Sequence, residues 1–200
     1  PGSTDSRFQR ERRGAKDRTY EIERLIARSL RAGIDLEALG PHSLTVDCDI
    51  LNADGGTRCA SITAATIALR LGVRRLIEQG LCLPAADRKP ADAGREWEPR
   101  ELSSDEKSAH EAAVLPVDVA AISVGLIGED VYLDLDYILD SNADVDMNVI
   151  GTSDGMLVEV QGTGEEATYS RAQMDALMDM AEIGLGKLHQ LQQDALQGQN

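Results

Sequence analysis

The chain has 200 residues, 42% of them hydrophobic, which is enough for one ordinary domain with a packed core. Its formal net charge of −15 would repel phosphate backbones and anionic membranes if it were evenly spread, so the charge alone argues against a nucleic-acid partner. No apolar run approaches the roughly 18 residues of a membrane span, which argues against a membrane protein. Three cysteines without a CxxC pair, and no visible secretory signal, predict reduced thiols in a cytoplasmic protein.

The charge is unevenly distributed along the chain. Residues 1–31 hold nine arginines and lysines against five acids, a net charge of +4, which leaves −19 for the remaining 169 residues. The basic start is either a solvated tail beside a helix or a strip that follows a phosphate backbone. Because the chain has only six aromatic residues, any nucleic-acid contact would be mainly to phosphate and sugar rather than by base stacking.

The first half of the chain predicts a helix, a strand and a second helix. Apolar residues recur every three or four positions over 19–39, which is typical of an amphipathic helix, and Gly40-Pro41 ends it. Apolar and polar residues alternate over 42–51, which predicts a half-buried strand. After Gly55-Gly56 breaks the chain, the period over 57–79 is helical again.

The second half predicts an insertion followed by strands and a closing helix. Residues 84–113 carry scattered prolines and charges with little apolar surface, so we expect a flexible surface insertion. Two strand pairs and a helix that Ser170 caps then follow, at 117–127 with 131–137, 147–150 with 156–160, and 170–196. The fold class is therefore predicted as a mixed α/β (α+β) sandwich, a single domain over 1–200 interrupted at about 84–113.

The sharpest local motif is Asp54-Gly55-Gly56-Thr57-Arg58, between the predicted strand and helix. Two glycines let the backbone approach a ligand, the helix N-terminus presents N–H groups, and Thr57 and Arg58 add a hydroxyl and a bidentate donor. The motif therefore suits an oxyanion such as phosphate. The simpler interpretation is a tight turn with a helix cap.

A second motif is a cluster of five aspartates within thirteen residues: Asp134, Asp136, Asp140, Asp144 and Asp146. Mg²⁺ usually takes one or two carboxylates from protein, and Asp140 and Asp146 at the two ends of a loop could supply them. The simpler interpretation is a solvated acidic loop. Asp47 and Asp49 share a predicted strand face and could also bind metal, although an outward polar face explains them too. The three histidines form no triad or zinc pattern, which disfavours histidine-dependent nucleophilic catalysis.

Together these segments resemble the ribonuclease PH family of phosphorolytic 3′-to-5′ exoribonucleases. The matching sequence segments follow one another in the same order over nearly the whole chain outside the insertion. They are Arg18-Thr19-Tyr20-Glu21-Ile22, Arg24 to Arg31, Asp47 to Arg58, Ala121 to Gly125, Asp140-Ser141, Asp146 to Val149, and Glu159 to Thr163. The resemblance starts partway into the family pattern, so we expect the family's opening strands to be missing upstream of Pro1.

The resemblance implies a role for each candidate residue. It places the phosphate site on Arg18, Gly56, Thr57 and Arg58, and the metal and acid–base carboxylates on Asp140 and Asp146. Within that pair we expect Asp146 to be the general acid and Asp140 to hold the metal. The arginines that grip RNA in the family lie just before the first helix, which points to Arg7 and Arg10.

The resemblance also implies the reaction and its partners. Inorganic phosphate would be the co-substrate and Mg²⁺ or Mn²⁺ the metal, and nucleoside diphosphates would be released from 3′ extensions of tRNA precursors and possibly rRNA. The reverse reaction would add nucleotides to 3′ ends. A homohexameric ring, a trimer of dimers, is the implied assembly. Two alternatives remain: a non-catalytic RNA-binding ring subunit, and a hydrolytic two-metal exonuclease using Asp47, Asp49, Asp140 and Asp146.

Overall fold

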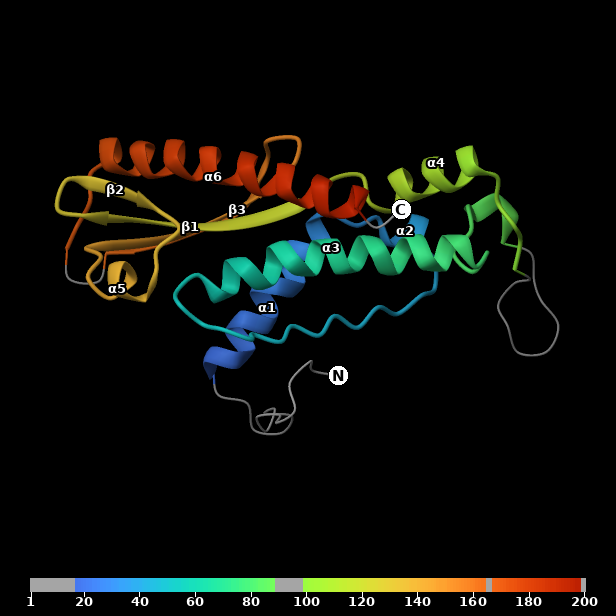
Figure 1. The fold of residues 1–200 in the computed structure, drawn as a ribbon, viewed down its shortest axis with the longest axis horizontal. Coiled ribbons are helices and arrows are strands. Elements are labelled where there is room, and N and C mark those ends of the chain that lie inside the picture. Colours follow the sequence, from blue (N-terminus) through green and yellow to red (C-terminus); the bar gives the residue numbers. More distant parts are fainter. Residues whose placement is uncertain (1–16, 89–98, 165–166, 199–200) are drawn as a thin grey trace.

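The computed structural model describes residues 17–88, 99–164 and 167–198, and Figure 1 shows their arrangement. The helices are α1 Asp17–Ala32, α2 Leu36–Leu39, α3 Thr57–Glu78, α4 Ser104–Val114, α5 Tyr137–Asp140 and α6 Arg171–Gln197, with a 3₁₀ turn at Ala85–Asp87. The strands are β1 Val119–Ile127, β2 Asp130–Leu133, β3 Val145–Thr152 and β4 Leu157–Gly164.

The four strands form one antiparallel sheet in the order β2-β1-β3-β4. The two predicted strand pairs are confirmed as β1–β2 and β3–β4. Two tight turns built on Gly128 and Gly155, both with positive φ, close these pairs. β2 ends at Leu133 rather than at 137, because Asp134 turns the backbone into the left-handed region at φ 58°.

α6 covers one face of the sheet (Figure 1). Alternate residues of β1 and β3 point to this face and pack against Leu177, Ala181 and Leu185 of the helix. The predicted helix is confirmed almost to its limits. Ser170 is its N-cap and forms a capping box with Gln173, as the sequence indicated for Ser170.

α3 and α1 cover the opposite face of the sheet. Cys59 and Ile62 of α3 and Leu25 of α1 are buried against Ala121 of β1 and Ile150 of β3. The predicted α/β sandwich is therefore confirmed, with the sheet between α6 and the α1–α3 pair. The C-terminal half of α3 runs beyond the sheet and forms a second apolar core with α2, α4 and the Cys82-Leu83 segment.

The predicted flexible insertion over 84–113 is wrong for its second half. Residues 104–114 form α4, and Ser103 and Glu106 make a complete capping box at its start. Leu102 and Val114 are buried in the second core, which supplies the packing that this stretch appeared to lack. Residues 89–98 of the insertion lie outside the described part of the chain.

Two predictions for the first half need correction. The helix expected over 19–39 is divided into α1 and α2, because the chain turns at Gly33 and Asp35 caps α2 through the Glu37 and Ala38 N–H groups. The strand expected over 42–51 is an extended segment without a ladder partner among the described residues. Its alternation is real up to Val46, since His42, Leu44 and Val46 are half-buried and the residues between them are exposed.

Two expectations from composition can be compared with the structure. All three cysteines, of which Cys48 alone is exposed, are free thiols. Among the helices described, none is both long and apolar enough to cross a membrane.

Candidate active site

The Gly55-Gly56 turn is held against the segment that follows β2. Both glycines have positive φ, 79° and 53°. A side chain on Gly55 would meet the Leu135 carbonyl oxygen at 2.2 Å, so only glycine fits there. The Asp54 carboxylate accepts a hydrogen bond from the Tyr137 N–H at 3.1 Å. These contacts fix where α3 begins relative to the sheet.

The N-terminus of α3 is open to an anion. Gly56 is the N-cap and supplies no side-chain cap, and the first turn of this 22-residue helix contains no acidic residue. The free N–H groups and the helix dipole therefore favour a negative ligand at this end. Thr57 and Arg58 lie in the first turn, so the structure brings three of the predicted phosphate-site residues together.

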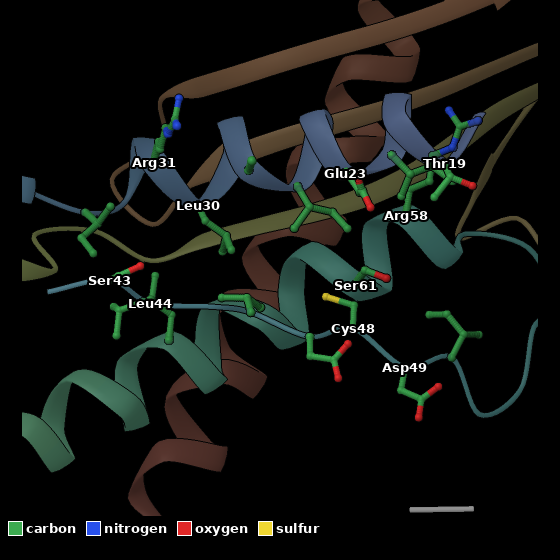
Figure 2. A pocket seen from close by; sticks show the side chains of 18 of the residues that line it. Thr19, Glu23, Leu30, Arg31, Ser43, Leu44, Cys48, Asp49, Arg58 and Ser61 are labelled. Atoms are coloured by element: carbon green, nitrogen blue, oxygen red, sulfur yellow. The ribbon is translucent and has the colours of Figure 1, made fainter. Parts of the chain in front are cut away.

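Arg58 is linked to α1. Its guanidinium donates a hydrogen bond to Glu21 at 3.3 Å, and Figure 2 shows it beside Thr19. Arg18, the fourth predicted phosphate-site residue, is exposed in the first turn of α1, next to Thr19 in the sequence. Arg58 therefore lies at the start of α3, and Arg18 lies in the first turn of α1, the helix to which Arg58 is hydrogen-bonded. Arg7 and Arg10 lie outside the described residues.

A polar patch of the sheet lies beneath the start of α3. Asp146 and Asn148 of β3 pair with Gly125 and Ser123 of β1, so their side chains share the face that α3 covers. The Cys59 thiol in the first turn of α3 donates to the Asn148 amide oxygen at 3.0 Å. Asp146, one of the two predicted catalytic carboxylates, is thus placed next to the open helix N-terminus.

The pKa of the Cys59 thiol is affected by the charged side chains around this site. Its pKa is raised to about 12, first by burial, then by the carboxylates of Asp146 and Asp134, against an opposing effect of Arg58. The thiol therefore stays protonated at neutral pH and serves as a hydrogen-bond donor rather than a nucleophile. Asp134, Asp146 and Arg58 therefore all lie close enough to Cys59 to influence its charge.

Asp134 is a site residue that sequence reasoning did not single out from the acidic cluster. Its side chain is exposed, and Oδ1 lies 3.7 Å from the position that a Cβ on Gly56 would occupy. It is the one non-glycine residue with positive φ among those described. Such a conformation is more frequent near functional sites than elsewhere. The spacing of the aspartates gave no signal for it.

The other aspartates of the acidic cluster lie at different places, and two of them bind different backbone groups. Asp136 caps α5 by accepting from the Leu139 N–H at 2.8 Å, and Asp144 accepts from the Gly128 N–H at 2.7 Å. Asp140 is the exposed last residue of α5, the helix whose first N–H is bound by Asp54. Within the described ranges, no three His, Cys, Asp or Glu side chains form a group that could hold a metal ion.

A groove runs from this site along α1. It has a volume of about 900 Å³ and lies between α1, α3 and the extended segment 42–50 (Figure 2). Thr57 and Arg58 line one end, and Asp47 and Asp49 line the side formed by the extended segment. The rest of the lining is largely apolar, contributed by α1 residues such as Ile22, Ile26 and Leu30.

Comparisons with known proteins agree on one family. Residues 1–72 match the model of the 3′ exoribonuclease family, domain 1, and residues 119–184 match that of domain 2. Ribonuclease PH of Rhodopirellula baltica is 52% identical over 197 residues, which cover 98% of this chain and 71% of that protein. Ribonuclease PH of Synechococcus sp. is 45% identical over 195 residues, covering 98% and 68%. Ribonuclease PH of Bacillus cereus (strain B4264) is 45% identical over 201 residues, covering 98% and 70%.

Solved structures share the fold at much lower sequence identity. Rice (Oryza sativa) Rrp46 has a TM-score of 0.57 at 14% identity, covering 92% of this chain and 68% of that one. A chain of an archaeal exosome core has a TM-score of 0.55 at 17% identity, covering 88% and 64%. At these identities the likeness concerns the fold alone.

Proposed function

Because this chain belongs to the 3′ exoribonuclease family, we propose that it is a phosphorolytic 3′-to-5′ exoribonuclease that shortens RNA with inorganic phosphate. The observation that carries the proposal is the uncapped N-terminus of α3, with Thr57 and Arg58 in its first turn and Asp146 on the sheet beneath it. A phosphorolytic enzyme must bind inorganic phosphate in addition to the scissile phosphodiester, whereas a hydrolytic nuclease binds the phosphodiester alone. The proposed substrates are the 3′ ends of tRNA precursors and of rRNA.

In the proposed reaction, phosphate occupies the N-terminus of α3. The N–H groups of the first turn, the Thr57 hydroxyl and the guanidinium groups of Arg58 and Arg18 bind its oxygens. The doubly charged phosphate must be held beside an RNA phosphodiester that is also negative, so the two anions repel each other. Fixed cationic donors reduce that repulsion and orient the attack, which are the main means of catalysis in phosphoryl transfer.

The chemical step exchanges one P–O bond for another. An oxygen of inorganic phosphate attacks the phosphorus of the last phosphodiester, and the bond from phosphorus to the 3′ oxygen of the preceding nucleotide breaks. The terminal nucleotide leaves as a nucleoside diphosphate. The 3′ oxygen of the shortened RNA takes a proton, for which Asp146 is the proposed general acid. The reverse reaction adds a nucleotide from a diphosphate and releases phosphate.

The carboxylates near α3 suit a hard divalent cation. Mg²⁺ takes one or two carboxylates from a protein and completes its shell with phosphate oxygens and water, so the absence of a three-residue group among the described side chains is no obstacle. Asp140 and Asp146 would hold the Mg²⁺ or Mn²⁺ ion, with Asp140 as its principal ligand. When bound, the ion would neutralise charge on the phosphate oxygens.

The proposed setting is a cytoplasmic homohexameric ring built as a trimer of dimers. Its support is the family membership, together with exposed apolar side chains at Leu51, Tyr137 and Ile138, each at least two-thirds exposed in one copy. Burying such side chains is a common outcome of subunit assembly. The mass of the particle in solution, measured by light scattering after gel filtration, tests the ring directly.

The test of the function is the identity of the released nucleotide. The protein is incubated with a tRNA that carries a short 3′ extension, with and without inorganic phosphate, and the products are separated by chromatography. Shortening that requires phosphate and releases nucleoside diphosphates supports phosphorolysis. Shortening without phosphate, or release of monophosphates, points to the hydrolytic alternative, and binding without shortening points to a non-catalytic RNA-binding subunit.

Two variants test the site. Arg58→Ala removes a charge-assisted donor and should raise the KM for phosphate about 10- to 100-fold, whereas Arg75→Ala, an exposed arginine near the other end of α3, should leave it unchanged. Asp146→Asn should lower kcat with less effect on the KM for phosphate. Equal effects of the Arg58 and Arg75 substitutions would contradict the placement of phosphate at α3.

A further inference from the structure

A second cavity lies on the other side of the sheet from the proposed active site. It has a volume of about 340 Å³ and lies between α6 and the hairpin that joins β3 to β4; we call it the α6 pocket. Val149 and Leu185 belong both to its lining and to the apolar core between the sheet and α6. The pocket therefore lies on the face of the sheet that α6 covers, whereas the start of α3 lies on the opposite face.

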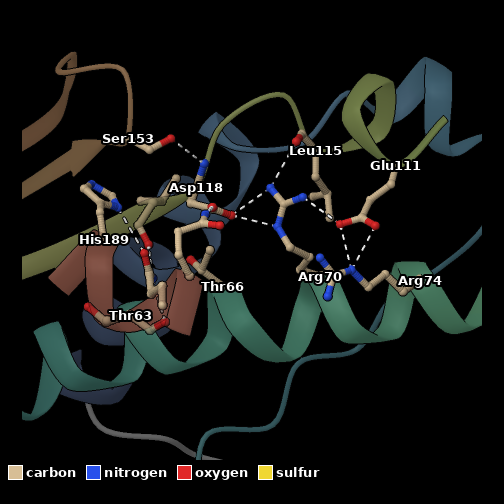
Figure 3. A network of polar contacts seen from close by, with 12 residues as sticks. Thr63, Thr66, Arg70, Arg74, Glu111, Leu115, Asp118, Ser153 and His189 are labelled. Atoms are coloured by element: carbon tan, nitrogen blue, oxygen red, sulfur yellow. Dashed lines mark hydrogen bonds and ion pairs between the residues drawn. The ribbon is translucent and has the colours of Figure 1, made fainter. Parts of the chain in front are cut away.

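His189, which lines the α6 pocket, has a fixed tautomer. The amide nitrogen of the buried Gln192 donates to the carbonyl oxygens of Thr63 and Val119, at 3.0 and 2.9 Å. This orients the Gln192 amide, so its oxygen faces His189 Nδ1 at 3.0 Å (Figure 3) and must accept a hydrogen bond from it. In the neutral ring, Nδ1 therefore carries the proton and Nε2 offers a lone pair.

That lone pair has no protein partner. His189 Nε2 is a buried atom that makes no hydrogen bond within the described part of the chain. A buried acceptor without a donor is costly, and native proteins rarely leave one without a compensating ligand or water. His189 therefore brings to the lining of the α6 pocket an imidazole whose Nε2 still needs an N–H or O–H donor.

The shape of the pocket depends on a glycine in the middle of α6. Asp179, Glu182, Gly186 and His189 follow one another at intervals of three and four residues, so they form one stripe along the helix. A Cβ on Gly186 would meet no atom within 4 Å, so the missing side chain leaves open space between Glu182 and His189. Glycine is a poor helix former, and nothing packs closely enough on this one to require it.

The charge of the lining selects the ligand. Asp179 and Glu182 line the pocket, and its lining contains no lysine or arginine. Neither carboxylate makes an ion pair or hydrogen bond with another described side chain. The remaining lining includes Met156, Met178 and Leu185, which offer apolar surface for an alkyl group.

We propose that the α6 pocket binds a small organic cation, an alkylamine or alkylguanidine, whose N–H group donates to His189 Nε2. Its positive charge lies near Asp179 and Glu182, and its alkyl part packs on the methionines. A carboxylate ligand would be repelled by the two acids, and a neutral alcohol would satisfy the acceptor without using the charge. The site stands independently of the proposed exoribonuclease activity.

The experiment compares butylguanidinium and butylamine with butanol and butyrate, which share the alkyl part. Binding to the 200-residue chain is measured by calorimetry, and long-range ¹H–¹⁵N spectra of the imidazoles report the contact with His189, which His189→Gln identifies among the three histidines. We expect the two cations to bind saturably and to move the His189 Nε2 resonance. Asp179→Asn combined with Glu182→Gln should weaken binding about tenfold, less so at high salt.

A matched pair of glycine substitutions controls for folding. Gly186→Leu fills the pocket and should abolish binding, while Gly72→Leu, on the exposed surface of α3 and also without atoms near its Cβ, should leave it unchanged. Circular dichroism checks that both variants are folded, and Gly186→Ala serves if the larger side chain proves disruptive.

Three results would each overturn the proposal. They are equal binding of butanol or butyrate, binding that survives Gly186→Leu, and no cation binding at millimolar concentration. The proposal would also be overturned if the His189 resonance moved when only the protein concentration was raised. The cation that reaches the pocket would then be a lysine or arginine side chain of a second copy rather than a small molecule.

Discussion

The guanidinium of Arg58 and the carboxylate of Glu21 lie 3.3 Å apart, so the arginine at the start of α3 is tied to an acid on α1. Their side chains are 30% and 41% exposed, and ion pairs that open to solvent contribute at most about 1 kcal/mol to stability. The pair therefore matters less for holding α1 and α3 together than for the charge at the open helix end. A bound phosphate would share Arg58 with Glu21.

We expect Glu21→Gln to strengthen phosphate binding. Removing one negative charge near the anion should lower the KM for phosphate about two- to threefold at low ionic strength, and the difference should shrink as salt is added. Steady-state phosphorolysis at varied phosphate measures it. Glu78→Gln, at the exposed far end of α3, is the control. An unchanged or higher KM in Glu21→Gln would mean that the acid positions Arg58 more than it competes for it.

Asp134 should tolerate only residues that accept a left-handed backbone. At a φ of 58° aspartate and asparagine are tolerated better than alanine because their short polar side chains can hydrogen-bond locally, and glycine is tolerated because it has no Cβ. Asp134→Ala should therefore lower the free energy of unfolding by about 1 kcal/mol, while Asp134→Gly and Asp134→Asn stay close to the original. Urea denaturation followed by circular dichroism measures the difference. Asp130→Ala, at an exposed position of β2 with negative φ, is the matched control and should change stability little. Equal stability of the two alanine variants would contradict the argument.

The elements that the sequence predicted well carry strong local signals. α3 follows two glycines and α6 follows an N-cap serine, and both have long apolar periods. α4 is not predicted because residues 84–113 carry scattered prolines and charges with little apolar surface, whereas Ser103 with Glu106 is a capping box before a helix. The segment 42–51 was assigned as a strand because its alternation is genuine, but a strand also requires a hydrogen-bonding partner, which no local pattern reveals.

In the candidate site, too, the residues fixed by local sequence were predictable and those fixed by distant strand pairing were not. Gly56, Thr57 and Arg58 were predictable because they are adjacent in the sequence and their chemistry depends on a local turn. The position of Asp146 under α3 depends on the β1–β3 register, which pairs it with Gly125, and the position of Asp134 depends on the end of β2. Both are consequences of strand pairing between distant segments. The acidic cluster and then the family resemblance pointed to Asp146, whereas nothing in the sequence separated Asp134 from the other aspartates of the cluster.

A partly buried ionic network should make Glu111 important for stability. Its carboxylate accepts from Arg70 at 2.8 Å and from Arg74 at 2.9 Å, and Arg70 also binds Asp118 (Figure 3). The Glu111 side chain is only 16% exposed, so Glu111→Ala leaves two partly desolvated cations short of a partner and should cost about 3 kcal/mol. Thermal and urea unfolding measure the loss. The exposed Glu101→Ala should change stability by less than about 0.5 kcal/mol, and a similarly small loss for Glu111→Ala would show that the network relaxes around the vacancy.

Glu106 should make the stability of the α4 region depend on acid pH. Hydrogen bonds from Arg100 at 2.8 Å, and then from the Ser103 N–H at 2.8 Å, lower the pKa of Glu106 from about 4.5 to about 2. Because the folded state lowers the pKa, the stabilisation is complete above the unfolded value and is lost as the pH falls from about 4.5 to about 2.

We therefore expect Glu106→Gln to have a shallower fall of unfolding midpoint than the original chain over that acid window, and a lower midpoint at neutral pH. The glutamine keeps an oxygen acceptor for the Ser103 N–H, so the capping box survives while the charge interaction with Arg100 is removed. Urea midpoints at a series of pH values measure both effects. Glu101→Gln, which is exposed and outside the capping box, should follow the slope of the original chain. Parallel curves for Glu106→Gln and the original chain would show that Glu106 is not responsible for the acid dependence.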